Sequence, residues 1–331
     1  MIRIGINGFG RIGRALTRVI GQRSDMQVVA VNDLATLPNL AHLLKYDTTH
    51  RQFPGTIATE EPGILRINNN PVQVSHHPDP AQIDWKELDI DVIIECTGLF
   101  KTIDKANAHL QNAPKVIISA PPADDMPTVV LGINEQLLET NLNVVSNASC
   151  TTNSAAPLLQ IIDTICGIEH AYITTVHSYT TDQQLQDGPH KDFRRGRAAA
   201  ESIVPTTTGA AKAITRVFPK LQGKIGGAGI RVPVPDGSLT DITFTVKKTA
   251  SVKAINEAFE KASHSEALQG ILGYTGDPIV SRDVIGSSYS CLFDEGLTSV
   301  LGKMVKVVGW YDNEMGYSHR LADLALLLAV K

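Results

Sequence analysis

A glycine-rich stretch near the N-terminus constrains the fold of this chain more than any other feature of its sequence. Gly8, Gly10 and Gly13 form a G-x-G-x-x-G pattern, which directly follows a strand-like segment and opens a helical pattern of apolar residues. The next strand-like segment ends at Asp33, 20 residues after Gly13. This arrangement is typical of dinucleotide-binding βαβ units. The stretch therefore predicts a doubly wound α/β sheet.

Each glycine of this pattern is required for a different physical reason. Gly8 permits the tight turn, Gly10 lets a pyrophosphate approach the backbone at the helix N-terminus, and Gly13 lets helix and strand pack closely. The carboxylate of Asp33 is expected to accept hydrogen bonds from the ribose hydroxyls. The alternative interpretation is a tight turn that binds no ligand.

Four further apolar segments are predicted to extend the parallel sheet. They are residues 91–98, 115–122, 129–132 and 142–145. The ligand of such a sheet lies beyond the carboxyl ends of its strands, and Thr97, Ser119 and Cys150 all lie at such ends. Residues 37–46 are expected to form a helix. The segment 52–74, rich in Gly and Asn, is expected to form hairpins outside the main sheet.

Cys150 lies where a predicted strand runs into a predicted helix over residues 154–165. Pro157 implies that this helix either kinks or begins only near Ala156. A helix N-terminus presents free N–H groups and a partial positive charge, an environment that favours a thiolate. The alternative is a buried structural cysteine.

His177 closes a predicted strand over residues 171–179 and follows Cys150 by 27 residues. That separation is too large for a local motif. A Cys–His pair would therefore have to be assembled by the fold, with the imidazole activating the thiol. The alternative is a histidine that only satisfies its hydrogen bonds.

The second half of the chain has the pattern of a mainly antiparallel sheet with helices on one face. Strands are expected at 228–235, 240–247 and 305–311, and helices at 202–217 and 254–262. Between them, residues 180–197 form a polar loop with four positive charges. Residues 319–330 are strongly apolar and are expected to dock as a helix on the first domain.

Composition excludes several classes of function. The net charge is −4 with the signs mixed, so nucleic-acid binding is not implied. No apolar run reaches the roughly 20 residues that span a membrane, and the N-terminus lacks the apolar core of a signal peptide. The four cysteines are scattered, as expected of free thiols in the cytoplasm. The histidines lack partners at metal-ligand spacing, so no metal is predicted.

Taken together, these residues resemble the phosphorylating glyceraldehyde-3-phosphate dehydrogenases of the bacterial type along the whole chain. The resembling segments are Ile6–Gly13, Asn32–Leu34, Ser146–Asn153, Thr175–His177, Asp182–Gln183, Lys191–Arg195, Pro205–Lys212 and Trp310–Glu314. The resemblance implies an α/β plus α+β chain, a Rossmann-type doubly wound sheet followed by a catalytic domain with a mainly antiparallel sheet. The NAD-binding domain would be residues 1–149, completed by a C-terminal helix at 314–331, and the catalytic domain residues 150–313.

The resemblance also implies a reaction and a role for each site residue. Cys150 would attack the aldehyde of glyceraldehyde 3-phosphate, His177 would polarise the thiol and take the proton, and inorganic phosphate would release the thioester as 1,3-bisphosphoglycerate in glycolysis or gluconeogenesis. The implied NAD-binding residues are Gly8, Gly10, Arg11, Ile12, Gly13, Asp33, Thr97, Ser119 and Asn313. The substrate phosphate would meet Thr180, Asp182 and Arg231, and the attacking phosphate Ser149, Thr151, Arg195, Thr208 and Gly209. The polar loop would pack at an interface of a homotetramer.

The chain also departs from the family's pattern at three places. Ser154 replaces a second cysteine, His77–Asp79 replaces a segment whose arginine often touches adenine, and Val234–Gly237 replaces Thr-Pro-Asn-Val. Because an acid near a phosphate dianion is unexpected, we predict that Asp182 orients Arg231. The alternatives left open are an erythrose-4-phosphate dehydrogenase, a non-catalytic NAD-binding protein and a cysteine hydrolase.

Overall fold

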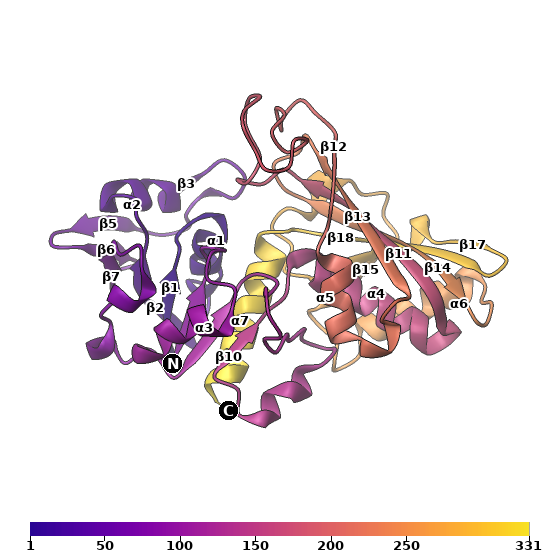
Figure 1. The fold of residues 1–331 in the computed structure, drawn as a ribbon, viewed down its shortest axis with the longest axis horizontal. Coiled ribbons are helices and arrows are strands. Elements are labelled where there is room, and N and C mark those ends of the chain that lie inside the picture. Colours follow the sequence, from indigo (N-terminus) through magenta and orange to yellow (C-terminus); the bar gives the residue numbers. More distant parts are fainter. Residues whose placement is uncertain (331) are drawn as a thin grey trace. The chain divides into compact units, whose positions relative to one another are not determined.

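The computed structural model describes residues 1–330, and their contacts divide the chain into two units (Figure 1). The first unit contains Met1–Val129, Glu135–Ala148 and the chain from Ser318 onward. The second contains Val130–Asn134 and Ser149–Tyr317. The boundary between Ala148 and Ser149 falls immediately before Cys150.

The first unit is built on an eight-stranded sheet. In spatial order its strands are β10 (Val144–Ser146), β9 (Lys115–Ile118), β8 (Val92–Glu95), β1 (Ile2–Asn7), β2 (Met26–Asn32), β7 (Asn70–Ser75), β6 (Ile64–Ile67) and β5 (Ile57–Glu60). Neighbours from β10 to β7 pair in parallel, and β6 and β5 are antiparallel. Every residue of β8 and β9 is buried, as expected of central parallel strands covered on both faces.

Short helices and a small hairpin complete this unit. They are α1 (Arg11–Ile20), α2 (Leu37–Lys45), α3 (Ile103–Ala106), the 3-10 turns η1 (Pro80–Gln82), η2 (Lys86–Leu88), η3 (Asn107–Gln111) and η4 (Glu135–Thr140), and the strands β3 (Tyr46–Asp47) and β4 (Arg51–Gln52). The C-terminal helix α7 (Met315–Ala329) starts four residues before the apolar run 319–330 and one residue after the start at 314 that the resemblance implies. Its leucines Leu321, Leu324 and Leu328 are fully buried. Arg23, after α1, donates to Asp323 of α7 at 2.6 Å.

Two predictions for this unit are wrong. The hairpins over 52–74 are not outside the main sheet, because Gln73, Val74 and Ser75 of β7 pair in parallel with β2. Residues 129–132 form no strand: the N–H of Val130 goes to the Asn134 side chain at 2.7 Å, and Gly132 has φ = 77°. That positive φ turns the chain where a strand would continue it.

The second unit contains another eight-stranded sheet, with helices packed on one face (Figure 1). Its path is β12 (Val204–Thr206), β13 (Ile225–Val232), β11 (Ile168–Ser178), β14 (Ser238–Val246), β18 (Met304–Tyr311), β16 (Cys291–Asp294) and β15 (Leu272–Thr275), with β17 (Ser299–Leu301) paired to β18. The helices are α4 (Cys150–Cys166), α5 (Ala210–Val217) and α6 (Val252–Ser263), with 3-10 turns η5 (Pro219–Leu221), η6 (Ser281–Val284) and η7 (Glu295–Leu297). The sheet is mainly antiparallel, except that β11 pairs in parallel with β13, and β15 with β16.

The structure corrects two helix boundaries here. Helix α4 begins at Cys150 and carries Pro157 in its interior, so it does not start near Ala156. The predicted helix over 202–217 is wrong in its first half, where β12 pairs with β13 and α5 begins only after Gly209. The run Thr206-Thr207-Thr208 explains the difference, since β-branched residues favour extended backbone.

Candidate active site

The glycine loop of the first unit has the geometry that its sequence predicts. Gly8 has φ = 95°, and a Cβ there would approach the Thr97 nitrogen to 2.7 Å. A Cβ on Gly13 would collide with the Gly8 carbonyl oxygen. A Cβ on Gly10 would meet nothing within 4 Å, and Gly10 is the N-cap of α1 without a side chain to cap it. The helix N-terminus is therefore open to an anion such as a pyrophosphate.

Asp33 is held beside this loop by two backbone donors. Its carboxylate accepts from the N–H of Phe9 at 2.7 Å and from that of Ala35 at 3.0 Å. A carboxylate accepts about four hydrogen bonds, so capacity remains for the hydroxyls of a ribose. The residues of this unit thus fit a dinucleotide.

Thr97 and Ser119, which are also predicted to bind the cofactor, are held in place by hydrogen bonds to Glu95. Glu95, at the end of β8, accepts from the Thr97 N–H at 2.7 Å and from its hydroxyl. The Ser119 N–H donates to the Glu95 carbonyl at 2.9 Å. Arg11 forms an ion pair with Asp47. As the first residue of α1, it also contributes its backbone N–H to the N-terminus of that helix.

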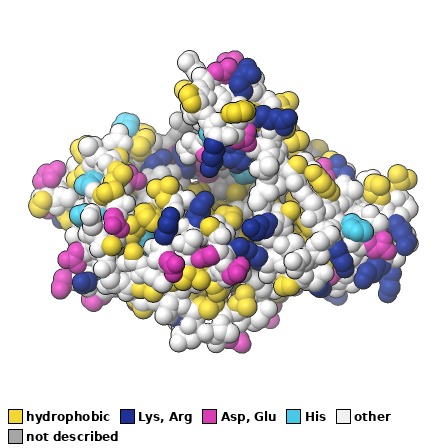
Figure 2. Space-filling view, in the orientation of Figure 1, with side chains coloured by type: hydrophobic (Ala, Val, Ile, Leu, Met, Phe, Trp, Pro, Cys, Tyr) yellow, Lys and Arg dark blue, Asp and Glu magenta, His cyan; other side chains and the backbone are white. Residues whose placement is uncertain are grey.

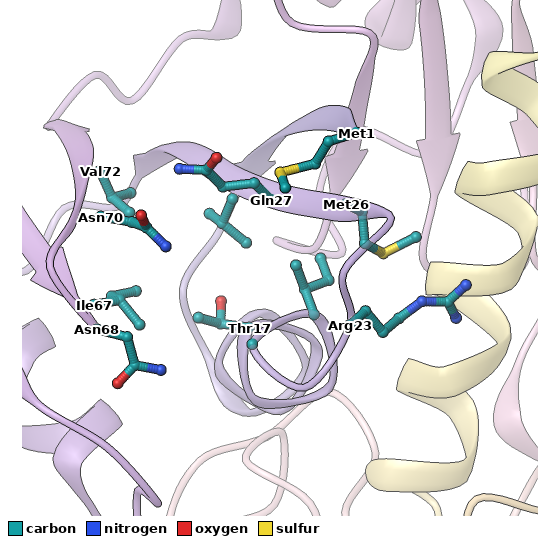
Figure 3. Close-up of a pocket in the computed structure, with 12 residues that line it drawn as sticks. Met1, Thr17, Arg23, Met26, Gln27, Ile67, Asn68, Asn70 and Val72 are labelled. Carbon is teal, nitrogen blue, oxygen red and sulfur yellow. The ribbon is translucent and has the colours of Figure 1, made fainter.

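A cavity of about 150 Å³ in the first unit is separate from these residues (Figure 3). It is lined by residues that include Met1, Thr17, Met26, Gln27 and Asn70. Met1 and Met26 stand at the starts of β1 and β2, the opposite strand ends from those that carry the glycine loop and Asp33. None of the predicted site residues lines this cavity.

In the second unit the fold brings Cys150 and His177 together. Cys150 is the first residue of α4, and its Sγ lies 3.5 Å from Nε2 of His177. Ser149 caps the helix by accepting the N–H of Thr152 at 3.1 Å. His177 stands at the end of β11 and is 6% exposed. The Cys–His pair that the sequence left as one of two alternatives is thus within reach of proton transfer.

Strand register explains what surrounds His177. In the parallel pair β11–β13, His177 lies opposite Arg231. Nη1 of Arg231 is 2.7 Å from Nδ1 of His177 and donates to the Ser178 carbonyl at 2.9 Å. Nδ1 of His177 also lies 2.8 Å from that carbonyl. Because arginine only donates, Nδ1 can bond either to Arg231, when it carries no proton, or to the Ser178 carbonyl, when it does. The second tautomer, with the proton on Nδ1, leaves Nε2 free to accept the proton of Cys150.

Burial controls the charge of this pair. Burial and, to a smaller extent, the charge of Arg231 lower the pKa of His177 to about 3. Burial also raises the pKa of the Cys150 thiol, against the opposing effects of Arg231 and of hydrogen bonds from Thr151. Desolvation thus opposes the thiolate that the helix N-terminus was expected to favour, and it outweighs the effects of Arg231 and Thr151 on the pKa of the thiol.

The structure also corrects the predicted partner of Asp182. Its carboxylate pairs with Arg195 and accepts from the Thr180 hydroxyl, while Nη1 of Arg231 donates to the Ser178 carbonyl and lies beside Nδ1 of His177. Nε of Arg195 donates to Thr206 at 3.0 Å. Asp182 and Arg195 share the polar loop, so they meet more readily than either meets a side chain at the end of β13.

The remaining residues predicted to bind phosphate gather at two helix N-termini. Ser149 and Thr151 lie at the start of α4. Gly209 is the N-cap of α5, and the Thr208 hydroxyl accepts the N–H of Ala210 at 3.2 Å. Both ends suit an anion.

Sequence reasoning missed the role of Tyr311 in this site. Its buried hydroxyl lies 2.9 Å from the hydroxyls of both Thr151 and Thr175, and its ring stands edge-on to His177 at 6.0 Å. Tyr311 thus joins the first turn of α4 to β11. The signal for it was its position in the resembling segment Trp310–Glu314.

A dinucleotide-binding sheet followed by a unit in which a half-buried cysteine contacts a buried histidine is the arrangement of an NAD-dependent dehydrogenase that uses a cysteine. Residues 2–103 match the family described as the glyceraldehyde 3-phosphate dehydrogenase NAD-binding domain, and residues 149–313 match the corresponding C-terminal domain. The chain therefore belongs to the glyceraldehyde-3-phosphate dehydrogenase family. These matches confirm the predicted fold class, enzyme class and NAD cofactor.

Full-length relatives agree with this assignment. The chain is 51% identical over 330 residues to "Glyceraldehyde-3-phosphate dehydrogenase 1" of Streptomyces avermitilis, covering 99% of this chain and 98% of the relative. It is 49% identical over 334 residues to the "Glyceraldehyde-3-phosphate dehydrogenase" of Mycobacterium avium, with the same coverage.

Among residues 1–330, no helix is both long and apolar enough to cross a membrane. Acidic and basic side chains are mixed over the face seen in Figure 2.

Proposed function

We propose that this protein oxidises glyceraldehyde 3-phosphate with NAD and inorganic phosphate to 1,3-bisphosphoglycerate, in glycolysis or gluconeogenesis. The observation that carries the proposal is the 3.5 Å contact between Cys150 and His177 at the N-terminus of α4, with Arg231 beside it. Both relatives named above carry the name of this activity. A buried thiol and a base with a free ring nitrogen suit covalent catalysis on an aldehyde.

NAD would supply the acceptor for the two electrons and the hydrogen that leave the substrate carbon. The residues proposed to hold it are Gly8, Gly10, Arg11, Ile12, Gly13, Asp33, Thr97, Ser119 and Asn313. The open N-terminus of α1 and the carboxylate of Asp33 support this assignment, since they suit a pyrophosphate and a ribose.

Cys150 and His177 perform the covalent steps in this proposal. The sulfur bonds to the aldehyde carbon while the thiol proton passes through Nε2 of His177 to the former carbonyl oxygen, which gives a thiohemiacetal. As that carbon is oxidised, His177 takes the hydroxyl proton and a thioester remains on Cys150. Inorganic phosphate then attacks the thioester carbon, and the sulfur leaves. The backbone N–H of Cys150 is a candidate donor to the oxygen that becomes negative in these steps.

Two arginines supply the two anion sites that the reaction needs. We assign the substrate phosphate to Arg231 with Thr180 and Asp182. The attacking phosphate is assigned to Arg195 with Ser149, Thr151, Thr208 and Gly209. Guanidinium binds phosphate through two parallel hydrogen bonds, and the ends of α4 and α5 add N–H groups.

The wider assignments rest on the family. We propose a cytoplasmic homotetramer in which the polar loop 178–197 packs against a neighbouring subunit. Exposed Leu185 and Phe193 on this loop support an interface, since they are 79% and 90% exposed in the single chain. We assign NAD binding to residues 1–149 with the helix 314–331, and catalysis to residues 150–313.

The test is NADH formation from glyceraldehyde 3-phosphate, with and without phosphate, and from erythrose 4-phosphate in parallel. We expect phosphate-dependent NADH formation and preference for the three-carbon sugar. Cys150→Ala should abolish the reaction while NAD still binds. Faster turnover of erythrose 4-phosphate would favour the sister dehydrogenase. Absence of NADH with intact NAD binding would favour a non-catalytic protein.

A further inference from the structure

Two serine hydroxyls converge on the side-chain oxygen of Asn313. Oδ1 of Asn313 accepts from Oγ of Ser178 at 2.9 Å and from Oγ of Ser238 at 2.6 Å. The two serines come from the end of β11 and the start of β14, and Asn313 follows β18. All three side chains are buried, with at most 5% exposed.

Donor counting fixes which way the Asn313 amide points. Each serine hydroxyl carries one proton, and Ser238 also accepts the N–H of Ser178 at 3.1 Å. The amide oxygen has two lone pairs and can accept both protons. The flipped amide would turn its NH₂ group to the serines and leave two buried hydroxyl protons without this acceptor, which costs free energy. Oδ1 therefore faces the serines, and the NH₂ group is left to recognise a ligand.

We propose that Ser178 and Ser238 are positioning residues that fix the Asn313 amide as a hydrogen-bond donor toward the nicotinamide carboxamide. The inference rests on the proposed function, which assigns Asn313 to that part of NAD. A fixed donor selects the carbonyl oxygen of the carboxamide and so determines how the group is turned. Without the two hydroxyls the amide can flip and offer its own oxygen instead.

Ser178 also allows this role to be separated from the chemistry of the thiol. Its backbone carbonyl contacts His177 and Arg231, whereas its side chain contacts Asn313. Substitution by alanine removes only the hydroxyl. The surroundings of Cys150 and His177 should therefore be preserved.

The test compares Ser178→Ala, Ser238→Ala and the double variant with the unaltered chain. Dissociation constants are measured by calorimetry for NAD and for ADP-ribose, which lacks the nicotinamide. Loss of these hydrogen bonds is expected to weaken NAD binding about tenfold in the double variant and about threefold in each single variant. Binding of ADP-ribose and the alkylation rate of Cys150 should not change. Ser290→Ala is the matched control, because Ser290 is buried in the same unit and its hydroxyl makes no hydrogen bond, to Asn313 or to any other described residue.

Unchanged NAD affinity in the variants would overturn the inference, and so would equal weakening of NAD and ADP-ribose, which would indicate general damage. If the double variant does not fold, the single variants decide, since each retains one hydroxyl. Failure of the unaltered chain to bind NAD or form NADH would contradict the proposed function itself. If the unaltered chain binds NAD and forms NADH, but the serine variants bind NAD with the same affinity, only the positioning role is contradicted.

Discussion

Replacing Arg231 by methionine is expected to slow alkylation of Cys150 at neutral pH. The Arg231 guanidinium is 2.7 Å from one ring nitrogen of His177, whose other ring nitrogen is 3.5 Å from the sulfur. The positive charge therefore lies within about 8 Å of Sγ, and at an effective dielectric constant of about 20 it stabilises a thiolate by roughly 2 kcal/mol. This free energy corresponds to about a thirtyfold change in thiolate fraction.

The assay is the rate of carbamidomethylation by iodoacetamide, a neutral reagent, followed by peptide mapping from pH 6 to about 10. At neutral pH the variant should react about thirtyfold more slowly, and at high pH the two rates should converge, because only the ionised fraction differs. Arg195→Met is the matched control. The Arg195 charge is already paired with Asp182, so its loss should change the rate by less than about threefold. Coincident rate profiles for Arg231→Met and the unaltered chain would refute the reasoning, as would an equal effect of both substitutions.

Three further predictions concern other parts of the site. Asp33 places a negative charge where the 2′-phosphate of NADP would lie, so kcat/KM should be at least about tenfold higher with NAD than with NADP. Steady-state kinetics of Asp33→Asn should show a smaller ratio of the two kcat/KM values. Arg231→Ala should mainly raise KM for glyceraldehyde 3-phosphate, and Arg195→Ala mainly KM for inorganic phosphate, each about ten- to a hundredfold; parallel changes in both constants would contradict the assignment. Burial lowers the pKa of His177 to about 3, below its unfolded value of about 6.5, so the folded state binds fewer protons and stability falls with decreasing pH. Urea unfolding should show about 2 kcal/mol of stability lost between pH 6.5 and about 5, and His177→Asn should lack this loss.

The parts of the fold that sequence predicted well are those with local causes. The glycine loop and Asp33 depend on backbone sterics over a few residues, and their geometry agrees with the prediction. The segment 52–74 was misplaced because its attachment to β2 is a pairing between distant parts of the chain. Residues 204–206 were predicted as helix although β-branched Thr206 favours extended backbone, and their pairing with the distant strand β13 cannot be seen in the sequence.

In the candidate site, too, the sequence predicted which residues take part but not the properties that depend on contacts between distant parts of the chain. Sequence identified Cys150 and His177, but the pKa of the thiol depends on desolvation by the whole second unit, which no local pattern reports. The pairing of Asp182 with Arg195 depends on the path of a long polar loop. The contact of Ser178 with Asn313 joins residues 135 positions apart, so no motif in the sequence relates them.

The parallel register of β11 and β13 has a consequence for how this protein can change. His177 and Arg231 are neighbours because the backbone ladder sets them opposite each other. Since successive side chains of a strand point to opposite faces, inserting or deleting one residue within either strand would turn one partner away from the other. The segment between these strands contains the polar loop, β12 and α5, and its length does not set this register. Single-residue insertions within β11 or β13 should therefore abolish activity in a protein that still folds.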